Sequence, residues 1–328
     1  MRVSAALRPT LSMASALCIF SACSGSQSLP SGVTLAPISV PAEGLAQKSR
    51  PLVFVSIMYS QIDVYQQTGM NKLAKTIKGQ ENPQGLAVDS AGDLFVANTY
   101  GPYVSEYAPP YKKVAAIIPA ATGQEPVGVA VSKDGILAVT SYSTASGLGN
   151  VTFYPKGSTA ACATIASDDL PRPVFDGFDL KDNLYVDGGP GFGSGVAVGR
   201  IKGACKAKKL ELLMTANSLS APGGIKVDRT GDIAIMNQGS SPVTIYTYNP
   251  PKKHSLGKPV STTQLDGLEY GLSFAFTASG DQLYAADSYF GVDMMREYAY
   301  PGGGQATNQF SIQGGYPVDQ ATAPAFFP

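Results

Sequence analysis

Small polar side chains recur at one point of a repeated sequence pattern, where a strand is expected to end. In successive copies this point holds Asn98, Ser141, Asp187, Asn237 and Asp287. Amide and carboxylate oxygens are the ligands that a hard cation such as calcium prefers. Asn and Asp also cap turns at strand ends by bonding nearby backbone groups. Asn98, Asp187, Asn237 and Asp287 are therefore candidate calcium ligands or a set of structural caps, and we favour the caps because repetition multiplies any structural residue.

Tyrosines follow the same strand ends by a few residues. They are Tyr59, Tyr100, Tyr142 and Tyr289. If the strand ends share one face of the fold, these rings share it too and could stack on a sugar or a peptide. Amphipathic tyrosines also cover the edges of sheets without binding anything. We take this face as the predicted ligand-binding face.

The elements that position these residues are short strands separated by tight turns. In the stretch 82–109, an apolar run at 85–88 is followed by the turn 89–93, in which Asp and Gly are typical turn residues. The run 94–97 returns, and a third, alternating strand covers 103–107 after a break. The pattern predicts antiparallel strands and no helix.

This unit is repeated along the chain. Its starts lie 43–49 residues apart, at Pro83, Pro126, Pro173, Pro222, Gly271 and Pro317. A period of roughly 40–50 residues with several strands is typical of propeller blades of four strands. The sixth start has room for one strand, whereas the region from residue 52 has later strands and no first one. We therefore predict an all-β, six-bladed propeller of antiparallel blades, closed by the C-terminal strand joining the N-terminal blade.

Composition and charge narrow the function classes. The 328 residues carry 24 basic and 24 acidic side chains, which does not favour a nucleic-acid partner. The single histidine, His254, lies in a Pro- and Lys-rich stretch, so we expect no His-based catalysis and assign no catalytic residue.

The N-terminus has the features of an export signal. Arg2 and Arg8 precede a short apolar run, which small residues and Cys23 follow. This resembles a bacterial lipoprotein signal, which implies cleavage after residue 22 and a lipid on Cys23; the alternative is an ordinary secretory signal. Residues 23–50 are rich in Ser, Pro, Ala and Gly and are predicted to form a flexible tether, followed by the propeller at 51–328. We expect an exported protein that meets the membrane through its lipid anchor only.

Two cysteines remain in the predicted propeller. Cys162 and Cys205 follow the third strands of two successive units. An exported compartment permits a disulfide between neighbouring blades. Two unpaired cysteines on outer strands, too far apart to bond, are the alternative.

The repeats resemble NHL-type repeats, in which a Pro-x-Gly-apolar-Ala-Val-Asp start leads to Gly-(Asp/Asn)-Leu-Tyr-Val-Ala-(Asp/Asn). The ranges 83–98 and 222–237 match this pattern well, and 126–141 matches it in part. The resemblance implies a six-bladed fold shared by calcium-dependent lactonases of the SMP-30/gluconolactonase type, arylesterases, amidating lyases and binding modules. Lyase and arylesterase sites of this kind need channel histidines, and lactonase sites use a Glu ligand that no equivalent position supplies here.

We therefore predict a non-catalytic binding or scaffold module of the cell envelope, without a cofactor, whose partner is an envelope protein or a glycan. The alternative is a calcium-dependent, lactonase-like hydrolase that uses the four candidate oxygen ligands.

Overall fold

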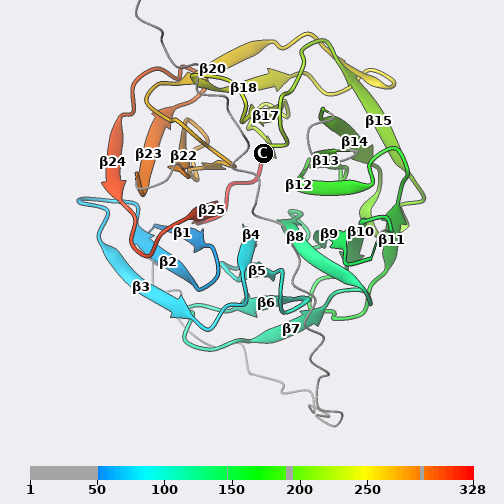
Figure 1. Cartoon of the computed structure of the whole chain (residues 1–328), viewed down its shortest axis with the longest axis horizontal. Coiled ribbons are helices and arrows are strands. Elements are labelled where there is room, and N and C mark those ends of the chain that lie inside the picture. The colour runs from blue at the N-terminus through cyan, green and yellow to red at the C-terminus, as the bar shows by residue number, and fades with distance from the viewer. Residues whose placement is uncertain (1–50, 146, 190–194, 289–291) are drawn as a thin grey trace, which may run out of the picture. The chain divides into compact units, whose positions relative to one another are not determined.

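Six four-stranded antiparallel blades form a closed ring in the computed structural model of the chain (Figure 1). The structure describes residues 51–145, 147–189, 195–288 and 292–328. The predicted signal peptide, Cys23, the tether and Tyr289 lie outside these ranges. Residues 48–328 form one compact unit. The predicted all-β, six-bladed propeller is confirmed.

In each of the first three blades, four strands follow one another from the centre of the ring outward. Blade 1 contains β25 (Pro317–Ala323), β1 (Leu52–Ile57), β2 (Gln61–Gln66) and β3 (Leu73–Lys78). Blade 2 contains β4 (Pro83–Val88), β5 (Leu94–Asn98), β6 (Tyr103–Tyr107) and β7 (Ala116–Pro119). Blade 3 contains β8 (Gln124–Val131), β9 (Leu137–Ser143), β10 (Asn150–Tyr154) and β11 (Ala163–Ala166).

The other three blades follow the same order. Blade 4 contains β12 (Arg172–Phe178), β13 (Leu184–Gly189), β14 (Ala197–Ile201) and β15 (Leu210–Thr215), to which β19 (Ser255–Gly257) adds in parallel. Blade 5 contains β16 (Ile225–Val227), β17 (Ile233–Asn237), β18 (Val243–Tyr248) and β20 (Ser261–Leu265). Blade 6 contains β21 (Ala275–Phe276), β22 (Gln282–Asp287), β23 (Met294–Ala299) and β24 (Asn308–Ser311). A single 3-10 turn, η2 (Ala204–Lys206), is the one helical element among the described residues.

The second strand of a blade is buried on both faces, because neighbouring blades pack against it. Every residue of β5, β13 and β17 is buried, which explains the apolar run with which each of these strands begins. The turn that leads into the second strand is held by an aspartate. In blade 2 the Asp89 carboxylate accepts hydrogen bonds from the amides of Ala91 and Asp93, both at 2.8 Å. Gly92, at φ 89°, supplies the left-handed residue that this turn requires.

The inner strands of neighbouring blades approach one another closely. A Cβ atom added at Gly85 would lie 2.7 Å from the Cα atom of Gly128 in the next blade. A Cβ atom at Gly177 would lie 2.6 Å from the carbonyl oxygen of Ile225. The repeated glycine of the first strand is therefore required by the packing around the central channel.

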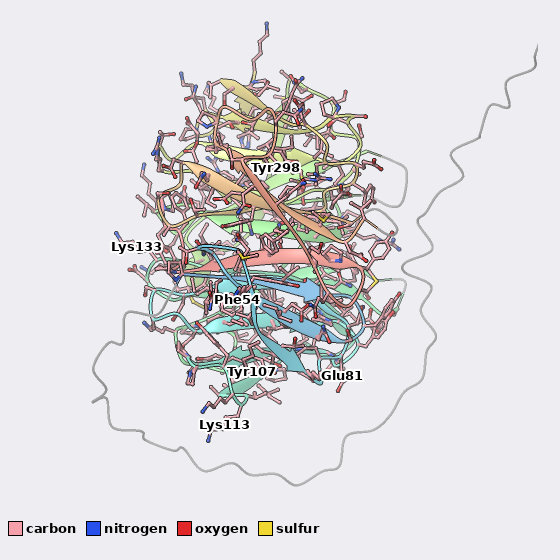
Figure 2. All side chains as sticks on the ribbon, turned by 90° about the vertical axis from the view of Figure 1, so that its left-hand side faces the viewer. Phe54, Glu81, Tyr107, Lys113, Lys133 and Tyr298 are labelled. Carbon is pink, nitrogen blue, oxygen red and sulfur yellow. A yellow bond between two sulfur atoms is a disulfide. The ribbon has the colours of Figure 1, made fainter. Side chains whose placement is uncertain are left out.

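The two faces of the ring carry different connections. One face, which we call the turn face, carries the tight turns between first and second strands, including the turn with Lys133. The other, which we call the tyrosine face, carries the loops between second and third strands and the loops that enter each first strand, including Glu81. Figure 2, an edge-on view, shows Lys133 and Glu81 at opposite faces.

A disulfide joins Cys162 to Cys205, with the two Cα atoms 5.1 Å apart. Cys162 lies between β10 and β11 of blade 3, and Cys205 lies in η2 after the third strand of blade 4. Of the two alternatives for this pair, the structure contains the bridge between neighbouring blades.

Candidate functional site

The tyrosine face is assembled from two kinds of loop that antiparallel pairing brings to one end of each blade. Pro83, which begins the first strand of blade 2, pairs with Asn98, which ends its second strand. Pro126 pairs with Ser141 in the same way in blade 3. Residues that precede a first strand and residues that follow a second strand therefore lie together on this face.

Two exposed tyrosines from neighbouring blades lie side by side on this face. The ring centroids of Tyr59 and Tyr100 are 6.2 Å apart and the rings are inclined by 37°. The side chains are 58% and 53% exposed. Tyr59 follows the second strand of blade 1, and Tyr100 follows the second strand of blade 2. Together they form an aromatic surface that is open to solvent.

The connection between blades 1 and 2 holds both tyrosine turns. The side-chain oxygen of Asn82 accepts a hydrogen bond from the amide of Tyr59 at 3.3 Å, and the Asn82 carbonyl accepts one from Thr99 at 3.2 Å. The carbonyl of Glu81 accepts a hydrogen bond from the amide of Tyr100 at 3.1 Å. The two tyrosine turns are therefore held by one connector, residues 79–82.

Two residues at the same place have a left-handed backbone conformation. Tyr59 has φ 71° and the buried Asn82 has φ 57°, which is the left-handed region that residues with a side chain seldom occupy. Such a conformation costs on the order of 1–3 kcal/mol and is found most often at binding and catalytic sites.

Two further tyrosines border this surface and were not predicted from the sequence. The hydroxyl of Tyr103 donates a hydrogen bond to the Glu81 carboxylate at 3.4 Å. Burial, with a contribution from Glu81, raises the pKa of Tyr103 to about 12. The carbonyl of Tyr316, which precedes β25, accepts a hydrogen bond from the amide of Met58 at 2.9 Å. The signal for both was available, because a residue that begins a third strand or precedes a first strand must reach this face.

The structure describes one of the other two predicted tyrosines, and its side chain is less exposed than those of the pair. Tyr142 lies near the end of β9 in blade 3, where its ring is half-buried and burial raises the pKa of its hydroxyl. Tyr289 lies outside the described residues.

The candidate calcium ligands in blades 2 and 5 bind the backbone that enters their own blade. The Asn98 side-chain oxygen accepts a hydrogen bond from the Glu81 amide at 2.9 Å, while its nitrogen donates to the Ser105 hydroxyl at 3.0 Å. The Asn237 side-chain oxygen accepts a hydrogen bond from the Ser220 amide at 2.8 Å. Each amide thus fastens the entering loop to the end of the second strand.

Asp187 accepts hydrogen bonds from two backbone amides in neighbouring blades. One oxygen accepts from Phe175 at 3.2 Å and the other accepts from Gly223, in the next blade, at 2.9 Å. Burial raises the pKa of Asp187 to about 8, although both backbone donors lower it. The carboxylate therefore connects blades 4 and 5.

Asp287 has the same role within blade 6. Its two oxygens accept hydrogen bonds from the amides of Glu269 at 3.3 Å and Tyr270 at 3.2 Å. Arg296 lies 3.4 Å from the same carboxylate.

Among the described residues, no three His, Cys, Asp or Glu side chains gather in a way that could hold a metal ion. Calcium binding by Asn98, Asp187, Asn237 and Asp287 stays a prediction, and it would require these oxygens to exchange backbone donors for a metal.

In the part of the chain that the structure covers, no helix is long and apolar enough to cross a membrane.

Comparisons with known proteins give structural likeness only. No family model matches the sequence, and no curated protein matches it. A protein of unknown function from Bacteroides caccae is similar in structure, with a TM-score of 0.61, 12% identity, and coverage of 84% of this chain and 99% of that one.

Two solved structures with known functions are also similar. Hydrazine synthase from Kuenenia stuttgartiensis has a TM-score of 0.53 at 14% identity, over 73% of this chain and 70% of that one. A gluconolactonase from Xanthomonas campestris has a TM-score of 0.54 at 14% identity, over 74% of this chain and 80% of that one. At such identities the likeness shows the fold alone: this chain is a six-bladed β-propeller, similar in architecture to these proteins.

Proposed function

We propose that this protein is a non-catalytic binding module that recognises a glycan of the cell envelope through Tyr59 and Tyr100. The observation that carries the proposal is the pair of exposed rings 6.2 Å apart. Aromatic rings offer a large apolar face and, in tyrosine, a polar tip, which suits the mixed surface of a sugar. The neighbouring Glu81 carboxylate adds a hydrogen-bond acceptor for sugar hydroxyls.

Preorganisation supports this interpretation. The connector 79–82 already fixes both tyrosine turns. Binding of a ligand would therefore cost little conformational entropy for ordering these turns. The predicted lipid on Cys23 and the tether 23–50 would display the propeller in the envelope, where such glycans are found. Both features are part of the proposal.

The test is isothermal titration calorimetry of the propeller with chitotetraose, maltotetraose and cellotetraose. We expect at least one tetrasaccharide to bind, and we expect Tyr59→Ala and Tyr100→Ala each to weaken it about tenfold, which is roughly 1.4 kcal/mol. Ile117→Ala is the matched control, because Ile117 is 52% exposed on the outer strand β7.

Equal binding by the tyrosine variants and the wild type would contradict the proposal. If no sugar binds but a peptide array gives signals that the tyrosine variants lose, the ligand is a protein. The tyrosine surface would then still be the binding site.

A calcium-dependent, lactonase-like hydrolase is the second candidate. The structural similarity to the gluconolactonase and the oxygen-rich strand ends at Asp187 and Asp287 favour it. Incubation with glucono-δ-lactone, with calcium or with chelator, separates the two candidates. We expect no hydrolysis above the buffer rate; hydrolysis that calcium supports and chelator abolishes would replace the binding proposal.

A further inference from the structure

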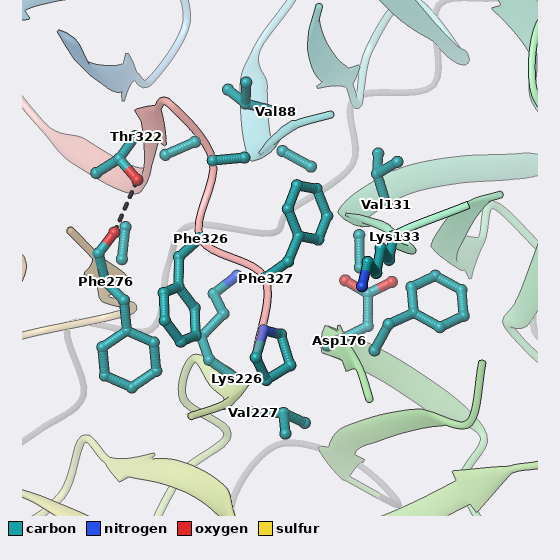
Figure 3. A pocket seen from close by; sticks show the side chains of 18 of the residues that line it. Val88, Val131, Lys133, Asp176, Lys226, Val227, Phe276, Thr322, Phe326 and Phe327 are labelled. Carbon is teal, nitrogen blue, oxygen red and sulfur yellow. Dashed lines mark hydrogen bonds between the residues drawn. The ribbon is translucent and has the colours of Figure 1, made fainter. Parts of the chain in front are cut away.

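A cavity of about 110 Å³ lies at the centre of the ring on the turn face, opposite the tyrosine face. Apolar residues at the ends of the inner strands form its walls, among them Val88, Val131, Val227 and Phe276 (Figure 3). Phe326 and Phe327, beyond β25, reach across it. Six polar side chains also line it. Asp176, Lys226, Gln320 and Thr322 come from the inner strands, and Lys133 and Asp179 come from the turns that follow them.

Two of these polar groups are buried without complete hydrogen bonding. Asp176 is 2% exposed, and its Oδ2 atom has no partner among the described residues. Gln320 is 1% exposed; its Oε1 atom accepts a hydrogen bond from the Ala286 amide at 3.2 Å, whereas its Nε2 atom has no described partner. A buried group left unsatisfied costs about 1–3 kcal/mol, so each such group calls for a ligand or water.

Lys226 brings a positive charge to the same cavity. No carboxylate lies within 4.0 Å of its ammonium group among the described residues, since the ion pairs found there involve other side chains. The nearby Asp319 carboxylate is already occupied: its oxygens accept hydrogen bonds from the amides of Leu86 and Gln320, both at 2.9 Å. Figure 3 shows the Lys226 side chain reaching toward Phe326 and Phe327.

Asp176 complements the charge of Lys226 as a donor. Burial raises the pKa of Asp176 well above its usual range, although Lys226 lowers it. In its protonated form this carboxyl can donate a hydrogen bond through one oxygen.

From this arrangement we propose that the cavity binds a small carboxylate anion between Lys226, Gln320 and Asp176. Lys226 supplies the charge, the Gln320 Nε2 atom donates a hydrogen bond, and the Asp176 carboxyl donates another. The cavity is large enough for a small carboxylate such as acetate or glycolate. The apolar walls and the two phenylalanines lower the effective dielectric around the ammonium group, which strengthens its attraction for the anion.

A metal cation would be a poor ligand for the same cavity. Lys226 would repel a metal cation, and the Gln320 Nε2 atom presents N–H groups, so Asp176 alone of these three side chains would offer free oxygens. The proposed site is separate from the tyrosine surface, and neither proposal depends on the other.

The test measures the thermal unfolding of the wild-type propeller with sodium acetate, with sodium chloride at equal ionic strength, and with acetamide, the neutral isostere of acetate. We expect acetate to raise the midpoint in a saturable way, because a ligand that binds only the folded state stabilises it by mass action. Chloride and acetamide should not do so. In Lys226→Met the dissociation constant for acetate, measured by calorimetry, should rise at least tenfold.

Lys181→Met is the matched control, since Lys181 is an exposed lysine on the turn face outside the cavity lining, and it should bind acetate as the wild type does. An effect of acetate no larger than that of chloride or acetamide would overturn the proposal, as would unchanged acetate binding in Lys226→Met. If Lys226→Met does not fold, the wild-type comparison of acetate with acetamide decides alone.

Discussion

The position at the end of each second strand shows how a residue acquires its role from its surroundings. It holds Asn98, Asp187, Asn237 and Asp287. Their oxygens accept hydrogen bonds from backbone amides of the loops that enter the first strands. Backbone amides outside the strand ladders need an acceptor, and these side chains supply it. The need to give these backbone amides a hydrogen-bond acceptor thus explains the shared residue type at this position, without any ligand.

Asn98→Ala tests this role. The substitution leaves the Glu81 amide and the Ser105 hydroxyl without a partner, so we expect the free energy of unfolding to fall by about 1–3 kcal/mol. Urea unfolding should give the same loss with calcium and with EDTA. A loss seen only with calcium would instead make Asn98 a metal ligand and favour the hydrolase.

At the scale of elements, blades 3, 4 and 5 are fastened to one another by more than packing. The disulfide joins blades 3 and 4. The segment 252–257, between β18 and β20 of blade 5, contains β19 and pairs with the outer strand β15 of blade 4. Arg200 reinforces this contact, because it donates to the Glu211 carboxylate at 2.9 Å and to the Lys253 carbonyl at 3.1 Å.

Replacing both Cys162 and Cys205 with Ser should lower the stability of the fold. The bridge spans a sequence separation of 43, for which loop-closure entropy predicts a contribution of up to about 4 kcal/mol. Urea unfolding should show a loss of about 2–4 kcal/mol, and dithiothreitol should destabilise the wild type but not the double variant. Equal stability of the two proteins in oxidising buffer would show that the bridge does not constrain the chain.

At the scale of the whole molecule, the ring is closed by pairing the two ends of the propeller. Leu52 pairs with Ala323, and Phe54 pairs with Ala321. Polar contacts extend the closure to blade 2: the Ser56 hydroxyl accepts from the Asp319 amide at 2.9 Å and donates to the Gln84 carbonyl at 2.7 Å. Blade 1 is therefore complete only when the chain ends meet.

Deleting residues 317–328 should prevent cooperative folding. The deletion exposes the edge of β1 and removes the acceptor of the Leu86 amide, so we expect aggregation or a broad, low-temperature transition in calorimetry. A synthetic peptide of residues 317–328, added during refolding, should restore a sharp transition. A truncated protein that melts cooperatively at the wild-type temperature would show that five complete blades and an incomplete blade 1 are sufficient for cooperative folding.

The amino-acid sequence alone determined the fold of this protein. The Asp-Gly turns and the short apolar strands depend on interactions within a few residues, and the period of 43–49 residues repeats them, so blade number and ring closure could be predicted from local patterns. It also placed Tyr59 and Tyr100 on one face, because a strand end must point to one side of its blade.

Only the tertiary structure decided which side chains meet. Whether Tyr59 contacts Tyr100, whether Cys162 reaches Cys205, and whether Asp176, Lys226 and Gln320 share a cavity all depend on the rotation and spacing of one blade relative to the next. That geometry is set by packing between strands far apart in the sequence, and no local pattern encodes it.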